Sequence, residues 1–250
     1  MRRHHARPRV LFSRCLALDP CRYDGDRVPD AFIGRLRAHV EAVDVCPEVA
    51  IGLGIPRPTI RLVGTPVNHR LIQPSTGRDL TGAMRAFTAQ TIDALPPLDG
   101  AVLKSRSPSC GLGDTKVYDT AVAAEPVGLT HGVFAREIRG AARGLALADE
   151  ARLGEPAVRR AFLERLFALA WLRDPTCTSP DLAGRLRHLL ALDEDHHRPT
   201  LEIALGRAPD PSIGAAIARA LTDGPSRDPD APLLYPAALH PGPGSAPTER

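Results

Sequence analysis

The chain has 250 residues, which is enough for one large domain or two small ones with a sizeable buried core. Its formal net charge of +3 is only mildly basic, so charge alone does not indicate a nucleic-acid partner. No signal peptide opens the chain and no apolar run is long enough to span a bilayer. We therefore expect a reducing, cytoplasmic location, in which the five cysteines are ligands or catalysts rather than disulfides.

The first elements alternate between strand and helix. Pro8–Ser13 is predicted to be a strand, because it contains a short apolar run, and it leads into the loop that carries Cys15. Pro29–Val43 has apolar residues at helical spacing and is predicted to be a helix. A short strand that ends at Val45 would then deliver Cys46 to a second loop.

The alternation continues toward the third cysteine. Thr59–Val63 and Arg70–Gln73 are predicted to be further short strands. A helix is predicted over Asp79–Leu95, where two prolines end it. Gly100–Lys104 has the continuous apolar pattern of a buried strand and leads into the loop that carries Cys110.

The second half of the chain reads as helical. Four helices are predicted there: Phe134–Leu147, Pro156–Arg173, Pro180–Leu192 and Ile213–Leu221. Beyond residue 223 the composition turns to proline, glycine and small residues, which is typical of a disordered tail. The expected organisation is an α/β domain over residues 1–133, a helical domain over 134–223 and a disordered tail over 224–250.

Strands that alternate with helices predict an α/β fold. The expected sheet is mainly parallel, of the Rossmann-like or flavodoxin-like kind, with flanking helices and a smaller all-helical C-terminal region. Ligands of such sheets bind beyond the carboxyl ends of the strands. Cys15, Cys46 and Cys110 each follow a predicted strand, so we expect all three at the same edge.

Three thiolates at one point suit an iron–sulfur cluster that leaves one iron open for a substrate. Cys21 lies near Cys15 in sequence and is a rival fourth ligand, which we interpret as a neighbour of the site. A structural zinc site is disfavoured because no Cys-x-x-Cys pair is present. Buried structural cysteine is the plain alternative for each of them, and Cys177 is expected to be incidental.

Several motifs in one order resemble a known family over roughly residues 8–135. They are Arg-Tyr-Asp-Gly at 22–25, Cys-Pro-Glu at 46–48, Gly-Leu-Gly-Ile-Pro-Arg at 52–57, Gly-Arg-Asp-Leu-Thr at 77–81 and Ser-Pro-Ser-Cys-Gly at 107–111. The chain thereby resembles the thiouracil desulfurases. This resemblance implies a [4Fe-4S] cluster on Cys15, Cys46 and Cys110, with a cysteine-free iron that takes the sulfur of a thiolated uracil.

The resemblance also favours catalytic roles for polar residues beside the cysteines. Glu48 would act as a general acid, although a solvated loop glutamate is the simpler interpretation. Ser105 and Ser107 precede Cys110, and a hydroxyl there, Ser107 in particular, could orient water or hydrogen-bond the uracil. Both could equally be ordinary turn serines.

Four further residues are candidates for substrate binding. Arg22, Tyr23 and Asp24 form a compact polar set after the first cysteine loop. Asp24 also begins an Asp-Gly turn signal, so it could simply hold the loop. Arg57 could bind an anionic group or cap its own loop.

The C-terminal region leaves the substrate open. Residues 150–156 and 162–167 are similar to the linker and first helix of fusions that act on 4-thiouridine in transfer RNA. The partner would be a free thiolated pyrimidine or transfer RNA, and an aromatic content of 4% weakens the RNA alternative. Two rival functions remain, a non-catalytic iron–sulfur or redox sensor and an interaction protein without metal. The sequence carries no signal for an oligomeric state.

Overall fold

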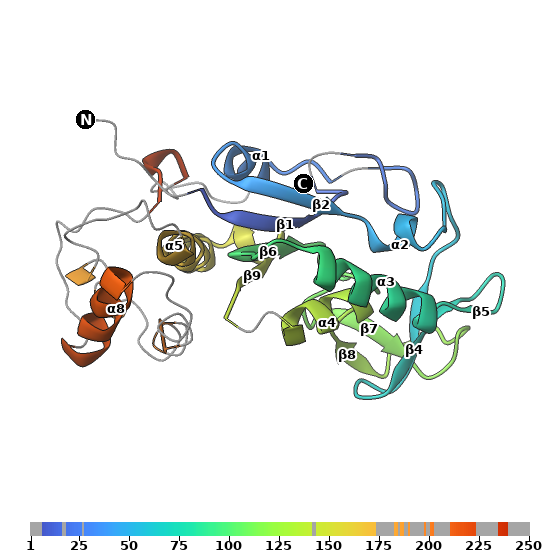
Figure 1. The fold of residues 1–250 in the computed structure, drawn as a ribbon. Coiled ribbons are helices and arrows are strands. Elements are labelled where there is room, and N and C mark those ends of the chain that lie inside the picture. The colour runs from blue at the N-terminus through green and yellow to red at the C-terminus, as the bar shows by residue number, and fades with distance from the viewer. Residues whose placement is uncertain are drawn as a thin grey trace.

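The computed structural model describes most of the chain up to residue 173 and parts of the remainder. The described residues are 7–16, 19–26, 28–141, 144–173, 183–184, 186–187, 190, 198, 201–202, 211–223 and 235–239. Within this part of the chain, no helix has both the length and the apolar character needed to cross a membrane. Figure 1 shows the arrangement of the elements.

A four-stranded parallel sheet forms the centre of the fold. Its strands are β1 (Arg9–Ser13), β2 (Glu41–Val45), β6 (Gly100–Leu103) and β9 (Ala146–Asp149), in the order β2-β1-β6-β9. All three pairings are parallel. This is the flavodoxin-like order: β2 lies on one side of β1, and the later strands β6 and β9 lie on the other side. The expected α/β class and parallel sheet are confirmed.

Helices cover both faces of this sheet (Figure 1). Val10 and Phe12 of β1 pack with α1 (Ala31–Arg37) and α5 (Pro156–Arg173), whereas Leu11 packs on the opposite face with α3 (Thr81–Ala94) and α4 (Val133–Ala141). This alternation follows from the two-residue period of a strand. Because both faces are covered, the central strands are apolar throughout.

A second, mixed sheet lies beside the first, where a single sheet was expected. It has the order β5-β4-β3-β7-β8 and consists of β3 (Arg61–Gly64), β4 (His69–Gln73), β5 (Arg78–Asp79), β7 (Thr115–Tyr118) and β8 (Gly128–Thr130). β3 and β4 occur where strands were predicted. Their residues Leu62 and Leu71, with Val117 of β7, pack into the core that α3 and α4 share.

Two predicted helices are too long. The helix expected over Pro29–Val43 ends at Arg37, after which a tight turn leads into β2. The helix expected over Phe134–Leu147 ends at Ala141, because Gly144 adopts a φ of +94° and the chain then enters β9. Two short elements, α2 (Pro47–Ala50) and η1 (Arg152–Gly154), were not predicted.

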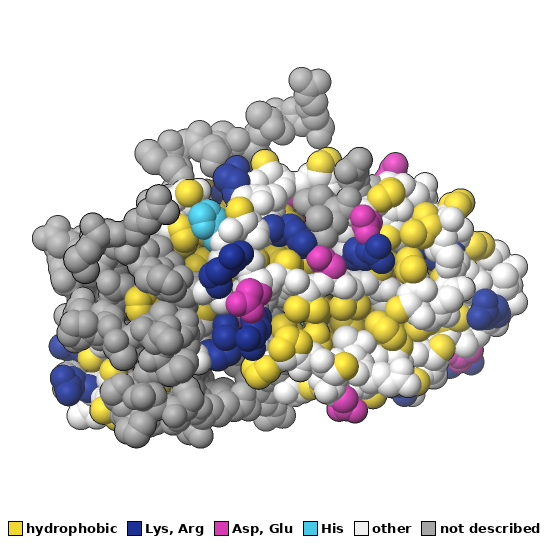
Figure 2. Space-filling view, turned by 45° about the horizontal axis from the view of Figure 1, so that its top comes forward, with side chains coloured by type: hydrophobic (Ala, Val, Ile, Leu, Met, Phe, Trp, Pro, Cys, Tyr) yellow, Lys and Arg dark blue, Asp and Glu magenta, His cyan; other side chains and the backbone are white. Residues whose placement is uncertain are grey.

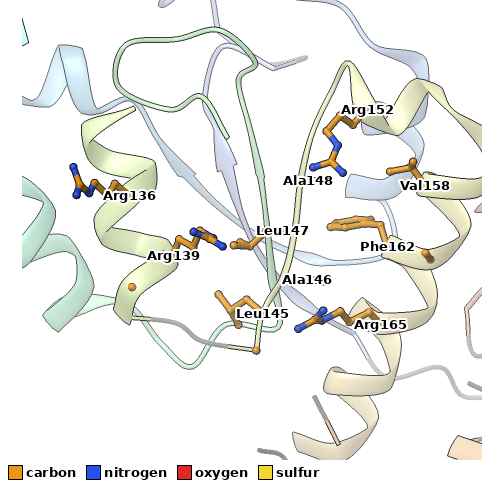
Figure 3. Close-up of a pocket in the computed structure, with 13 residues that line it drawn as sticks. Arg136, Arg139, Leu145, Ala146, Leu147, Ala148, Arg152, Val158, Phe162 and Arg165 are labelled. Atoms are coloured by element: carbon orange, nitrogen blue, oxygen red, sulfur yellow. The ribbon is translucent and has the colours of Figure 1, made fainter. Parts of the chain in front are cut away.

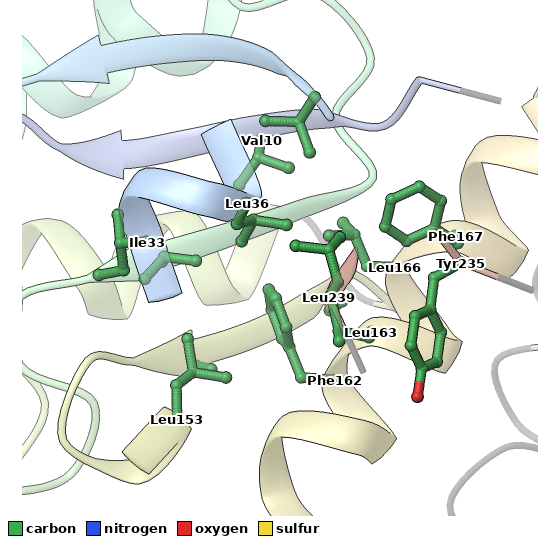
Figure 4. Packing of buried hydrophobic residues seen from close by; sticks show 14 of the residues in the cluster. Val10, Ile33, Leu36, Leu153, Phe162, Leu163, Leu166, Phe167, Tyr235 and Leu239 are labelled. Atoms are coloured by element: carbon green, nitrogen blue, oxygen red, sulfur yellow. The ribbon is translucent and has the colours of Figure 1, made fainter. Parts of the chain in front are cut away.

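The end of the described chain returns to the core. The helix predicted over 213–221 occurs as α8 (Pro211–Asp223), and most of the one predicted over 180–192 lies outside the described residues, as does Cys177. We expected residues 224–250 to be disordered, but Tyr235 and Leu239 are buried against α1 and α5, beside the short helix η2 (Ala237–Leu239) (Figure 4). Since β9 belongs to the central sheet, that sheet also continues past the domain boundary expected at residue 133.

Candidate functional site

Three neighbouring strands end at one cavity of about 420 Å³. Cys15 follows β1, Cys46 follows β2 and Cys110 lies in the loop after β6, and all three line this cavity together with Cys21. The prediction that the three cysteines meet at one edge of the sheet is therefore confirmed as geometry. It follows from the parallel pairing of β2, β1 and β6.

Backbone hydrogen bonds hold the first two cysteine loops. The amide of Arg14 donates to the carbonyl of Val45 at 2.9 Å, which joins the end of β1 to the end of β2. The carbonyl of Cys15 accepts from the amide of Val28 at 3.0 Å. Cys46 itself occupies the N-cap position of α2, with Pro47 in the first turn, where its fixed φ suits a helix start.

The third cysteine loop is held by a serine and by a close backbone approach. Ser107 Oγ accepts from the amides of Ser109 and Cys110 at 3.2 Å and 3.0 Å. A Cβ at Gly132 would lie 2.5 Å from the Ser109 carbonyl oxygen and 2.7 Å from the Cys110 amide. Only glycine therefore allows the start of α4 to approach the Cys110 loop this closely.

Burial and hydrogen bonding raise the pKa of the Cys21, Cys46 and Cys110 thiols. A hydrogen bond with Cys15, with burial added, raises the pKa of Cys21 to about 11. A hydrogen bond with Cys21 and then burial raise the pKa of Cys46, and burial raises that of Cys110 to about 12. Such thiols are poor nucleophiles. Coordination to metal deprotonates a thiol outright, so the same residues remain competent as ligands.

The cavity offers sulfur donors to a metal centre. Within the described ranges, no group of three or more His, Cys, Asp and Glu side chains is placed to hold a single metal ion. Cysteine thiolates are the soft ligands that an iron–sulfur cluster requires, and in such a cluster each thiolate binds a different iron.

Hydroxyl groups also face the third cysteine. Ser13 and Ser107 both hydrogen-bond the Cys110 side chain and oppose the effect of burial on its pKa. Ser13 in addition accepts from the amide of Lys104 at 2.9 Å, so it connects the ends of β1 and β6. Hydrogen bonds to sulfur are among the features that tune an iron–sulfur cluster.

Glu48 projects into the cavity from α2 and is fixed on both oxygens. Its Oε2 accepts from Arg57 Nε and Nη2 at 2.9 Å and 2.7 Å, and its Oε1 accepts from Ser109 Oγ at 3.0 Å. Arg57 is itself buried and donates through Nη1 to the carbonyls of Cys21 and Gly54, both at 3.0 Å. Arg57 is thus engaged within the protein, and it orients Glu48.

Ser105 lines the cavity but is engaged elsewhere. Its hydroxyl donates to Glu150 Oε1 at 2.6 Å, and its amide donates to Glu150 Oε2 at 2.8 Å. Lys104 forms an ion pair with the same carboxylate. This cluster joins the loop after β6 to the end of β9.

Of the three polar residues at 22–24, two line the cavity and one does not. Arg22 and Tyr23 line the cavity, and the guanidinium of Arg22 lies 5.6 Å from the centre of the Tyr23 ring. Asp24 is not part of the cavity wall. It pairs with Arg22 at 2.9 Å and accepts from the amide of Asp26 at 3.1 Å, as in a turn.

Sequence reasoning missed several residues of this cavity. Ser13 lines the cavity at the end of β1, and Ser109, which is buried behind it, holds Glu48 from the position next to Cys110. Their places at a strand end and beside a cysteine were the available signal. Basic side chains also surround the cavity and outnumber its one carboxylate, Glu48, among the described lining residues: Arg14, Arg22, Arg57, Lys104, Arg106 and Lys116. An excess of positive charge suits a site that gathers anionic thiolates.

Three comparisons with known proteins found similarities to this chain. The model of the 2-thiouracil desulfurase family matches residues 10–150. The uncharacterized protein YbbK of Bacillus subtilis (strain 168) is 31% identical over 111 residues, which is 42% of this chain and 74% of that protein. A solved structure of a [4Fe-4S]-dependent thiouracil desulfidase, TudS, is similar with a TM-score of 0.46 and 27% identity, over 61% of this chain and 97% of that one. The family match spans more than half of the chain and includes every cysteine of the cavity, so this protein belongs to the 2-thiouracil desulfurase family.

Proposed function

We propose that this protein removes sulfur from a thiolated uracil and releases it as hydrosulfide. Water would supply the oxygen that replaces sulfur on the ring carbon, so that the C=S bond is exchanged for C=O without net oxidation or reduction. The observation that carries the proposal is the meeting of Cys15, Cys46 and Cys110 at one cavity, in a chain that belongs to this family.

We infer that Cys15, Cys46 and Cys110 hold a [4Fe-4S] cluster. Such a cluster would supply a Lewis-acidic iron that has no cysteine ligand and can take the sulfur of the substrate. Cys21, which hydrogen-bonds with Cys15 and Cys46, lies close enough to be a neighbour of the site. A reducing compartment such as the cytoplasm suits these residues, because the four described cysteines are free.

Glu48 is our candidate for proton transfer. Its carboxylate lies in the cavity wall, and Arg57 and Ser109 fix its orientation. A carboxylate that is paired with a guanidinium can accept the proton of an attacking water. The general-acid role that the sequence suggested for Glu48 stays a prediction, in which the same group returns a proton as sulfur leaves.

The remaining residues divide into substrate contacts and positioning residues. We assign Arg22 and Tyr23 to the substrate, because both line the cavity and their polar ends can face a ring with amide groups. We assign positioning roles to three residues that are already held within the protein. Arg57 binds Glu48, Ser105 binds Glu150, and Ser107 binds the amides of the Cys110 loop. Asp24 would hold the turn that presents Arg22.

The size of the cavity favours a base-sized substrate. A volume of about 420 Å³ lies in the lower part of the range for small-molecule sites. On the face shown in Figure 2, basic and acidic side chains are interspersed. We therefore place free thiouracil before 4-thiouridine in transfer RNA as the substrate.

The test is hydrosulfide release by anaerobically reconstituted protein. Substrates would be 2-thiouracil, 4-thiouracil and 4-thiouridine-containing transfer RNA. Cys110→Ala should lose both its bound iron and its hydrosulfide release. Glu48→Gln should keep its iron, and its rate of hydrosulfide release should fall by about 100-fold or more. Glu125→Gln, an exposed residue outside the cavity, is the matched control and should retain both. Protein that binds the cluster but releases no sulfide from any substrate would contradict the desulfurase and favour the sensor.

A further inference from the structure

A second, larger cavity lies at the β9 edge of the central sheet. It has a volume of about 780 Å³ and opens between α4 and α5, with β9 as its floor (Figure 3). None of its lining residues lines the cysteine cavity. A volume of this size is in the range of small-molecule sites.

Four arginines from three elements surround this cavity. Arg136 and Arg139 lie on one face of α4, because they are three residues apart in a helix. Arg152 comes from η1 and Arg165 from α5. In Figure 3 the side chains of Arg139, Arg152 and Arg165 point toward the space between α4 and α5, whereas that of Arg136 points away from it. Among the described residues no aspartate or glutamate lines the cavity.

Among the described residues, three of these arginines are not paired with acidic groups. In the described part of the chain, neither Arg136, Arg139 nor Arg152 forms an ion pair with a carboxylate. Arg139 instead lies 3.4 Å from His131 Nε2. Burial chiefly, with Arg139 and Arg136 adding to it and Asp114 opposing, lowers the pKa of His131. Guanidinium groups beside a cavity whose described wall holds no carboxylate suit an anion.

The opposite part of the wall is apolar. Leu147 of β9 and Val158 of α5 are half-buried and contribute aliphatic surface. Phe162, which points toward β9 in Figure 3, belongs to the hydrophobic core and is only 6% exposed. The cavity thus combines guanidinium groups, which bind phosphate oxygens in a bidentate manner, with an aliphatic surface that can cover a base.

We propose that this cavity binds the phosphate group of a nucleotide, with Arg139 and Arg152 on the phosphate and the aliphatic side of Leu147 and Val158 against the base. The nucleotide could be free or part of an RNA strand, and the chemistry that recognises it is the same. This site is independent of the cysteine chemistry, since it shares no lining residue with it. An acidic peptide, which would satisfy the arginines but not the apolar wall, is the competing class of ligand.

Equilibrium binding to the full-length protein tests the proposal. The probes are UMP, AMP, a short oligouridylate, uridine without phosphate, and a peptide rich in glutamate. UMP, AMP or the oligouridylate should bind, and uridine should not. Tighter binding of the oligouridylate than of UMP would identify RNA as the source, and the reverse would identify a free nucleotide.

Two variants and a matched control locate the binding. Arg139→Gln and Arg152→Gln change exposed residues, and each should raise the Kd about tenfold, because each removes a hydrogen bond to a charged group. Arg85→Gln, an exposed arginine on the neighbouring helix α3, should leave the Kd unchanged. The proposal is overturned if no phosphate-bearing probe binds, if uridine or the peptide binds as well as UMP, or if the two variants bind like the control.

Discussion

At the residue scale, a buried guanidinium is the one cationic partner of Glu48 among the described residues. The Arg57 side chain is 3% exposed and that of Glu48 is 13% exposed, so their ion pair is largely desolvated. The same guanidinium holds the Cys21 and Gly54 carbonyls. Glu48, the cysteine loop and the loop before Arg57 are therefore held by one side chain.

Arg57→Ala should destabilise the fold by about 3 kcal/mol or more, because it leaves a buried carboxylate without its partner. The measurement is the free energy of unfolding in urea. The matched control is Arg70→Ala, since Arg70 and Asp79 are exposed and 3.6 Å apart. Its loss should stay within about 0.5 kcal/mol. Equal losses of unfolding free energy in the two variants would show that the buried ion pair stabilises the fold no more than an exposed one.

Gly132 tests the close approach of α4 to the Cys110 loop. Gly132→Ala should destabilise by about 1–3 kcal/mol and lower the iron content after reconstitution, because the new Cβ meets backbone atoms of Ser109 and Cys110. Gly140→Ala on the same helix meets no atom within 4 Å and should stabilise by about 0.5–1 kcal/mol. Normal iron content in Gly132→Ala would refute the argument that this approach positions Cys110.

Single residues could be predicted from the sequence only where the strand pattern fixed them. Cys15 and Cys46 stand directly beyond apolar runs, so their place at the sheet edge followed from the parallel fold. The engagement of Arg57 with Glu48 could not be predicted, because it depends on the path of the loop between them. The hydrogen bond of Ser105 to Glu150 could not be predicted for the same reason, since Glu150 lies 45 residues away.

At the element scale, β9 is joined to the cysteine edge through Glu150. The Glu150 carboxylate follows directly after β9 and holds Lys104 and Ser105 directly after β6. Burial alone would raise its pKa, but the hydrogen bonds from Lys104 and Ser105 outweigh burial and lower it below the ordinary value of 4.5. The ionised form is thus the one that the folded protein prefers.

This preference predicts a pH dependence of stability. Because the pKa of Glu150 is lower in the folded than in the unfolded chain, its contribution is present above about pH 4.5 and is lost as the pH falls through the folded pKa. Glu150→Gln should remove this component, so its unfolding free energy should fall less steeply than that of the wild type between about pH 5 and pH 3. Glu137→Gln, on the exposed side of α4, should keep the wild-type slope. If the unfolding free energies of all three proteins fall in parallel with pH, Glu150 does not contribute this pH dependence.

The elements themselves were predictable where one period dominated. β1, β6 and α5 have continuous apolar or clear helical patterns and occur where they were expected. β9 was read as the end of a helix, since its alanines and leucines continue the helical pattern of α4 and only Gly144 interrupts it. β7 and β8 carry lysine, threonine and glycine, and their strand state depends on pairing with β3 and with each other.

At the scale of the whole molecule, the chain closes its first core with its last described segment. Tyr235 packs beside Phe167 of α5, with ring centres 6.4 Å apart, and Leu239 is buried in the same cluster as Ile33 and Leu36 of α1 (Figure 4). The proline and glycine on both sides of this segment led to the prediction of a disordered tail. The composition is that of a tail, but two large side chains are enough to anchor it.

Leu239→Ala should therefore destabilise the protein by about 2–5 kcal/mol, because it opens a cavity between α1 and α5. Leu129→Ala is the matched control, since Leu129 is 57% exposed on β8, and its effect should stay within about 0.5 kcal/mol. Urea unfolding followed by circular dichroism gives both values. If the two variants unfold alike, residues 235–239 do not stabilise the core. If only Leu239→Ala is destabilised, the core formed by β1, α1 and α5 requires a segment that lies more than 200 residues after β1 in the chain. A chain that ends before residue 235 would then have a less stable central sheet, which is the sheet that carries the cysteines.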